Sequence, residues 1–149
     1  MKSQSLLLLL ACLLITGCGP SESVPEIVSV TGTLTMNGQP LDQVKVSFMP
    51  DGENGNQNAR SSWAETDSEG KYVLKYQLPG DERDGAAVGA HKVVLRDLIP
   101  NRSRGEQDEA PSATRRFDRK YTSATTTNLE ANVKAGDTNV FDFEVDENN

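Results

Sequence analysis

The sequence predicts an all-β fold, a β-sandwich of seven short strands. Apolar side chains alternate with polar ones at a period of two in one segment after another. Turn-forming residues, such as Asn37-Gly38 and Asp67-Ser68-Glu69-Gly70, stand between these segments. No stretch shows a convincing 3.6-residue helical period. Regularly spaced short strands with turns between them indicate a sandwich.

The first half of the domain contains four predicted strands. They cover residues 27–36, 44–48, 61–66 and 71–77. We expect the inward side to be formed by the apolar residues at every second position, among them Val44, Val46 and Phe48 in the second strand. Residues 37–40 supply the first turn, because Asn-Gly tolerates positive φ and Pro40 ends the ladder pairing. The third strand carries the only tryptophan, Trp63.

The second half contains three more predicted strands, after a loop at residues 79–89. They cover residues 91–97, 125–133 and 140–145, and their inward positions include Val93, Leu95 and Phe143. Residues 98–120 mix basic and acidic side chains and have few apolar ones. They form the longest candidate for a segment without regular structure, and such a loop is either functional or disordered.

The first eighteen residues predict an export signal that ends at a lipidated cysteine. Met1-Lys2 is followed by an apolar run, Leu6–Cys18, which is shorter than the roughly 20 apolar residues needed to span a bilayer. The segment Ile15-Thr16-Gly17-Cys18 resembles the bacterial lipobox, which implies cleavage before Cys18 and acylation of its thiol. The alternatives are an uncleaved signal anchor and a secretory signal with a chance cysteine.

We expect four regions along the chain. Residues 1–17 are the predicted signal peptide, 18–26 a flexible tether, 27–145 the sandwich domain and 146–149 an acidic tail. The mature chain has 132 residues, which suits one domain. Both cysteines lie in the leader or at its end, so the domain has no disulfide and no cysteine-based metal site.

The charge of the chain limits its partners. The formal net charge is −7 and becomes −8 when the leader, with its one lysine and no acid, is removed. An acidic chain with scattered basic residues argues against nucleic acid, which requires a basic face. It also argues against electrostatic docking on anionic lipid, so we expect membrane attachment through the lipid on Cys18.

Several motifs resemble those of carboxypeptidase regulatory-like domains. These are Val30–Leu34 followed by Gly38-Gln39-Pro40-Leu41, the strand Val44–Phe48, the hairpin Thr66–Tyr72, and Gly89–Leu95 with His91 in an aromatic slot. Lys120-Tyr121 and 129–136 are similar to the closing segment of short envelope lipoproteins of planctomycete-type bacteria. The resemblance implies a seven-stranded, Greek-key sandwich of the transthyretin-like type. It implies no shared catalytic function.

Four groups of residues are candidate sites, and each also has a plainer structural interpretation. His91 is the only histidine, so a triad or a two-histidine metal site would need substitutes, and we interpret it as a packed strand residue. Asp67 and Glu69 suit a hairpin turn better than half of a calcium loop. Arg115 and Arg116 are candidate contacts for an anionic ligand, or part of a solvated mixed-charge loop.

Trp63 is the fourth candidate, either as a platform for a ligand or as packing at the edge of the core. We therefore predict a non-enzymatic, lipid-anchored module of the cell envelope, more in keeping with the outer membrane because Gly19 rather than Asp follows Cys18. It would bind an envelope protein, peptide or glycan, or have a structural role, without catalytic residues, cofactor or metal. The alternatives are an envelope hydrolase using paired carboxylates and a calcium-stiffened adhesion domain.

Overall fold

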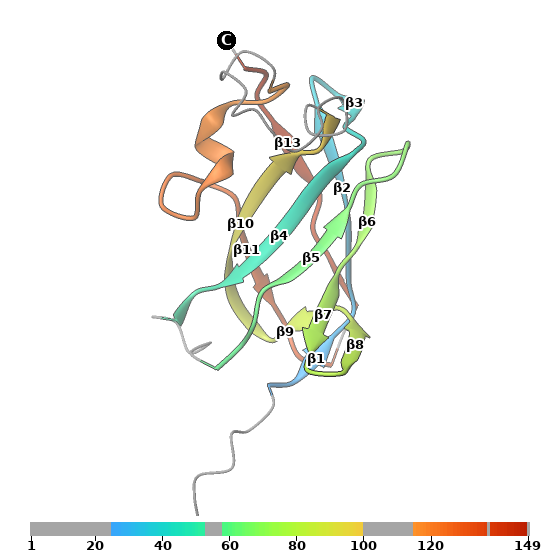
Figure 1. The fold of residues 1–149 in the computed structure, drawn as a ribbon, viewed down its shortest axis with the longest axis vertical. Helices are drawn as coiled ribbons and strands as arrows, with labels where there is room; N and C mark the ends of the chain where they lie inside the picture. The colour runs from blue at the N-terminus through green and yellow to red at the C-terminus, as the bar shows by residue number, and fades with distance from the viewer. Residues whose placement is uncertain (1–24, 53–57, 100–114, 137, 149) are drawn as a thin grey trace, which may run out of the picture.

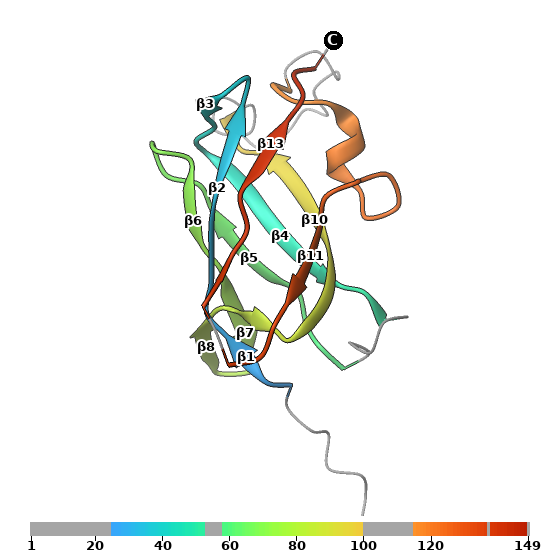
Figure 2. The same cartoon turned by 180° about the vertical axis from the view of Figure 1, so that it is seen from behind.

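The computed structural model describes residues 25–52, 58–99, 115–136 and 138–148, which form two layers of β-strands (Figures 1 and 2). The strands in chain order are β1 (Ile27–Val28), β2 (Val30–Met36), β3 (Gln39–Pro40), β4 (Val44–Pro50), β5 (Ser62–Glu65), β6 (Lys71–Val73), β7 (Lys75–Leu78), β8 (Asp81–Asp84), β9 (Ala86–Ala87), β10 (Gly89–Asp97), β11 (Glu130–Val133), β12 (Asn139–Val140) and β13 (Phe143–Val145). The described residues thus form more strands than the seven that the sequence predicts, and β4 and β10 are longer than predicted while the others are shorter or divided.

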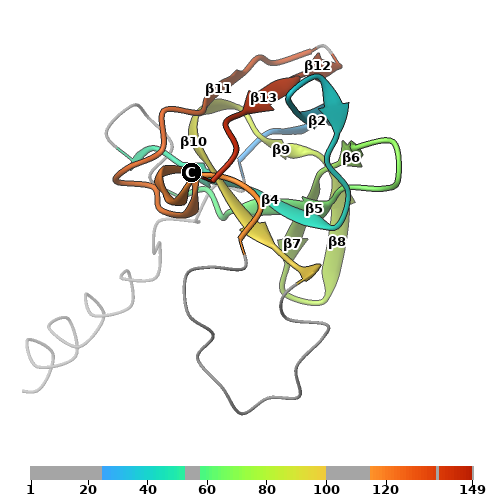
Figure 3. The same cartoon turned by 90° about the horizontal axis from the view of Figure 1, so that it is seen from above.

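One layer is an antiparallel sheet with the strand order β11-β10-β4-β5-β7-β8. The other is built around β2, which pairs with β3 and β6 in the antiparallel sense and with β12 and β13 in the parallel sense. Seen from above, β4, β5 and β7 lie on one side of the molecule, and β2, β12 and β13 lie on the other (Figure 3). The all-β, sandwich-like class predicted from the sequence is confirmed.

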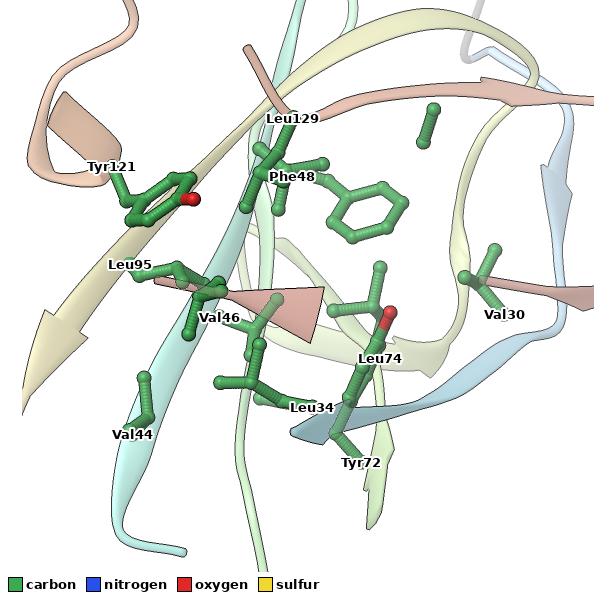
Figure 4. Close-up of a cluster of buried hydrophobic side chains, with 14 of the residues drawn as sticks. Val30, Leu34, Val44, Val46, Phe48, Tyr72, Leu74, Leu95, Tyr121 and Leu129 are labelled. Atoms are coloured by element: carbon green, nitrogen blue, oxygen red, sulfur yellow. The ribbon is translucent and has the colours of Figure 1, made fainter. Parts of the chain in front are cut away.

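The core lies between these layers and is made by the alternating inward side chains. Val44, Val46 and Phe48 of β4 are fully buried, and so are Leu34 of β2 and Val93 of β10. Figure 4 shows Phe48 near the centre of the buried cluster, with Leu74 and Tyr72 beside it. The inward face that the sequence predicts for β4 and β10 is therefore confirmed. Burial of this apolar surface is the main favourable contribution to folding.

The predicted strand 71–77 is wrong as a single element, because the chain passes from one sheet to the other within it. β6 pairs with β2, while β7 pairs with β5. The residue between the two strands, Leu74, is fully buried and its N–H donates to the carbonyl of Val30. The inward positions Tyr72, Leu74 and Tyr76 are buried as the alternation predicts.

Other predicted boundaries also shift. The expected loop 79–89 contains β8, which pairs with β7, and β9, which pairs with β1. Pro40 does not end the pairing, because β3 pairs with β2 through Pro40 and Thr35. The predicted strands 125–133 and 140–145 are shorter, since β11 begins only at Glu130 and an interruption separates β12 from β13. The turn at Asp67–Gly70 is confirmed, with Gly70 at φ 71°.

The segment 98–120 is only partly described. Residues 100–114 lie outside the described ranges, whereas residues Arg119–Thr122 form a short 3-10 helix with Tyr121 buried. The expected acidic tail is joined to this region: Phe117 and Glu147 form a β-bridge, and the N–H of Asn148 donates to the carbonyl of Arg116. Residues 146–148 are therefore hydrogen-bonded to the segment before the short helix.

The predicted leader, Cys18 and most of the predicted tether also lie outside the described residues. None of the helices among the described residues has the length and apolar character to cross a membrane. β1, the first described strand, lies at one end of the sandwich beside β7 and β8. The C-terminal residues lie at the opposite end, as Figure 1 shows.

Candidate binding face around Trp63

Trp63 lies on the outer face of the six-stranded sheet. Successive side chains of a strand point to opposite faces, so the buried positions of β4 and β10 place their alternate residues outward. The outward set on the three central strands comprises Lys45, Ser47 and Met49 on β4, Trp63 and Glu65 on β5, and Ala90, Lys92, Val94 and Arg96 on β10. We call this set the Trp63 face.

Ser47 stands at the middle of the Trp63 face. On one side it lies directly opposite Trp63 of β5, and on the other side directly opposite Val94 of β10. Residues directly opposite in neighbouring antiparallel strands have their Cβ atoms about 4.5–5.5 Å apart. The short Ser47 side chain therefore stands between two larger apolar side chains. Met49, the next outward residue of β4, is 39% exposed and extends the apolar surface.

Lys45 gives this face a cation beside its aromatic ring. The Nζ atom of Lys45 lies 4.1 Å from the centroid of the Trp63 ring. An ammonium group in this position is attracted by the negative face of the indole. The contact holds the lysine close to the sheet while Trp63 itself is only half-buried. The pair combines an apolar plane with a positive charge on the face of the ring.

The cations around this face differ in how they are paired. Lys92 forms an ion pair with Glu130 of β11, and Lys75 of β7 contacts Glu82 at 2.9 Å. Within the described ranges, neither Lys45 nor Arg96 forms an ion pair with a carboxylate. Lys45 lies directly opposite Glu65 of β5, and Arg96 lies directly opposite Lys45.

Arg116, predicted as a possible ligand contact, is occupied within the fold. Its guanidinium donates to both carboxylate oxygens of Asp97, with Nη2 to Oδ1 at 2.9 Å, and Nη1 donates to Oδ1 of Asp42 at 3.1 Å. Nη2 also donates to the backbone carbonyl of Asp42 at 2.6 Å. The side chain of Asp97 is only 3% exposed, so Arg116 neutralises a buried charge. Arg116 therefore links the end of β10 to the segment before β4.

The structure does not bring the predicted arginines to Trp63. Asp97, the partner of Arg116, occupies an inward position of β10, whereas Trp63 points outward from β5. Arg115 is half-buried, and among the described residues its Nη1 atom has no hydrogen-bond partner. Asp42 itself has a lowered pKa, chiefly because the side-chain amide of Gln43 donates to it, with Arg116 adding to the effect.

His91 is packed in the core. It is 2% exposed, and its ring centroid lies 5.8 Å from that of Phe48. Nδ1 lies 2.9 Å from the carbonyl oxygen of Gly89, which can only accept, so the proton of the neutral ring is on Nδ1. Nε2 is buried without a partner in the described part of the chain. Burial lowers the pKa of His91 below 6.5, partly opposed by the hydrogen bond to Gly89.

The carboxylate of Asp67 accepts hydrogen bonds from backbone groups of its own turn. Oδ1 of Asp67 accepts from the N–H groups of Glu69 and Lys71, both at 2.9 Å. Glu69 in turn contacts Lys71 at 2.5 Å. Throughout the described ranges, no group of three or more histidine, cysteine, aspartate or glutamate residues is arranged to hold a metal ion. The geometry at this turn is that of a hairpin connection.

The sequence singles out Trp63 and its period of two places Lys45 and Ser47 outward, but it does not show which strands lie side by side. The period of two already places Lys45 and Ser47 outward, so their exposure could be predicted. What the pattern lacks is the strand order, which places β10 beside β4 and so joins Val94 and Arg96 to the same surface.

Comparison of the chain with protein-family models, with curated proteins and with solved structures found no match in any of the three.

Proposed function

We propose that this chain is a non-enzymatic, lipid-anchored module of the bacterial cell envelope that binds an envelope partner through the Trp63 face. The observation that carries the binding role is the outward-facing Trp63 with Lys45 over its ring, beside Ser47 and Val94. Tryptophan is a preferred anchor residue at interfaces, because it buries a large rigid surface at little entropic cost.

Attachment through Cys18 is supported by the sequence of the leader and is compatible with the arrangement of the fold. β1 begins at one end of the sandwich, so a lipid-anchored domain would stand on that end (Figure 1). The outer face of the six-stranded sheet would then stand roughly perpendicular to the membrane surface, where partners in the envelope could reach it. We also propose the Greek-key topology of the carboxypeptidase regulatory-like type, on the motifs quoted from the sequence.

The anchoring is tested by metabolic labelling with palmitate in a bacterial host. We expect label in the native chain and none in Cys18→Ala, because the thiol is the acylated group. Cys12→Ala is the matched control and should retain the label, since Cys12 lies inside the apolar run. Label that persists in Cys18→Ala would overturn the anchoring.

The binding role is tested by chemical crosslinking in intact cells. A crosslinker placed on the Trp63 face through Ser47→Cys should give a discrete adduct that disappears when Trp63→Ala is added. A cysteine at Thr33, on the other sheet, is the control for random collision. Equal adducts from both positions, or an adduct indifferent to Trp63, would exclude the face as the binding surface.

A further inference from the structure

We infer that Asn37 is a latent deamidation site, which the fold keeps closed because Glu144 of β13 holds the N–H of Gly38. Asn37 and Gly38 form the turn between β2 and β3, since Met36 pairs directly with Gln39. Both have positive φ, 53° and 71°, as an Asn-Gly hairpin turn requires. Both are also exposed, so water reaches the turn.

Deamidation at this pair is an intramolecular substitution. The backbone nitrogen of Gly38 loses its proton and attacks Cγ of Asn37, and the new N–C bond closes a succinimide ring. The side-chain amide group leaves and takes up a proton, so that ammonia is released. Water then opens the ring at either carbonyl and leaves aspartate or isoaspartate in place of Asn37. Glycine favours the attack, because it has no Cβ to hinder the nitrogen.

Both reacting groups are held by carboxylates of the C-terminal segment. The N–H of Gly38 donates to Oε1 of Glu144 at 2.9 Å, and Nδ2 of Asn37 donates to Oε2 of Glu147 at 3.3 Å. The hydroxyl of Thr35 also donates to Glu144 and so positions its carboxylate beside the turn. The hydrogen bond from Thr35, followed by that from Gly38, lowers the pKa of Glu144. The acceptor at the Gly38 nitrogen is therefore an ionised group at neutral pH.

This ionised acceptor opposes the first step of the reaction. The Gly38 nitrogen must lose its proton before it attacks, and the negative charge formed there would lie beside the carboxylate of Glu144. Two like charges at this distance disfavour each other, so the amide keeps its proton. The pairing of Met36 with Gln39 also holds both ends of the turn and restrains the rearrangement that ring closure needs. The fold therefore slows a reaction that the exposed Asn-Gly pair would otherwise undergo.

The test follows deamidation of Asn37 in the full-length chain by peptide mapping with mass spectrometry, during incubation in mildly alkaline buffer. The same incubation in urea gives the rate for the unfolded chain, which keeps the Asn-Gly pair without its contacts. We expect the folded chain to react at least about tenfold more slowly than the unfolded chain, a factor that corresponds to the contribution of about one hydrogen bond to a charged group.

Three variants test the part played by Glu144. Glu144→Ala removes the acceptor and should raise the folded rate at least about tenfold, whereas Thr35→Val removes only the hydroxyl that positions the carboxylate and should raise it about threefold. Asp142→Ala is the matched control, because Oδ1 of Asp142 accepts from the N–H of Thr33 at 2.8 Å instead. It should leave the rate within about 1.5-fold of the native rate.

Three results would overturn the inference. Equal rates at Asn37 in the folded and unfolded native chain would show that the fold gives no protection. A native rate in folded Glu144→Ala would assign the protection to the strand pairing alone, and equal acceleration by Asp142→Ala would indicate general loosening of the segment. The emission of Trp63, the only tryptophan, checks that each variant is folded. Should Glu144→Ala not fold, Thr35→Val decides the same point, because its rate rises only if the placement of the carboxylate matters.

Discussion

His91 is expected to make the fold sensitive to mild acid, and His91→Phe should reduce that sensitivity. In the folded chain the ring is 2% exposed, and burial lowers its pKa below 6.5. In the unfolded chain the ring titrates near 6.5. Below pH 6.5 the unfolded state therefore binds more protons than the folded state, and stability falls as the pH falls.

The magnitude follows from the proton balance. A full proton difference costs about 1.4 kcal/mol per pH unit, so His91 lowers the free energy of unfolding by up to about 2 kcal/mol between pH 6.5 and pH 5. The charged ring would gain no compensating acceptor at Nε2, which has no partner in the described structure. Phenylalanine is similar in shape and cannot be protonated. It loses the hydrogen bond to Gly89, which contributes about 1 kcal/mol, and removes the unpartnered Nε2.

The assay is urea unfolding of the native chain and of His91→Phe, followed by Trp63 emission. It is carried out at about pH 7.5, 6.5 and 5, because these values lie on both sides of the ordinary histidine pKa of about 6.5. The two chains should lie within about 1 kcal/mol of each other at the highest pH, and the variant should lose less stability on acidification. Asp146→Asn is the control, because Lys120 and Tyr121 lower the pKa of Asp146 and its stabilisation is lost only below the carboxyl range. An equal loss of stability in the native chain and in His91→Phe would refute the reasoning.

Two further predictions concern stability. Arg116→Ala should lower the free energy of unfolding by about 3 kcal/mol, because it leaves the buried carboxylate of Asp97 unpaired. Arg116→Lys should recover only part of this loss. Full recovery by Arg116→Lys in denaturant unfolding would show that the two-nitrogen contact of the guanidinium with Asp97 is not needed. Gly85→Ala should cost about 3 kcal/mol or more, since Gly85 has φ 123° and a Cβ there would lie 1.9 Å from the carbonyl oxygen of Val28. Gly38→Ala, also at positive φ but with open space around it, should cost only about 1 kcal/mol, and similar melting temperatures for the two glycine variants would refute the close-approach argument.

The sequence predicts most of the inward face but not the partition of the chain between the sheets. At Val44, Val46 and Phe48 the period of two is regular and one face must be buried, so the pattern and the fold agree. At Leu74 the same alternation continues across the change of sheet, and therefore carries no sign of it. β8 was missed because all its residues are exposed and charged, so no apolar alternation marks it.

The candidate site was predictable in part for a similar reason. Trp63 stands out by its type, and its outward position follows from the strand pattern. The pairing of Arg116 with Asp97 and Asp42 could not be predicted, because contacts across such sequence distances depend on topology. Cys18 lies outside the described residues, so its lipidation stays a prediction from the leader.

The parallel pairing of β13 with β2 has a consequence for the order of folding. Val145 lies opposite Met36, so the two partners are 109 positions apart in the sequence (Figure 2). Contacts between residues so distant in sequence form late, because the cost of closing the loop comes before the gain. β2 thus lacks this neighbour until the final residues have been synthesised. A chain that still lacks its last residues would therefore remain open along that side of β2.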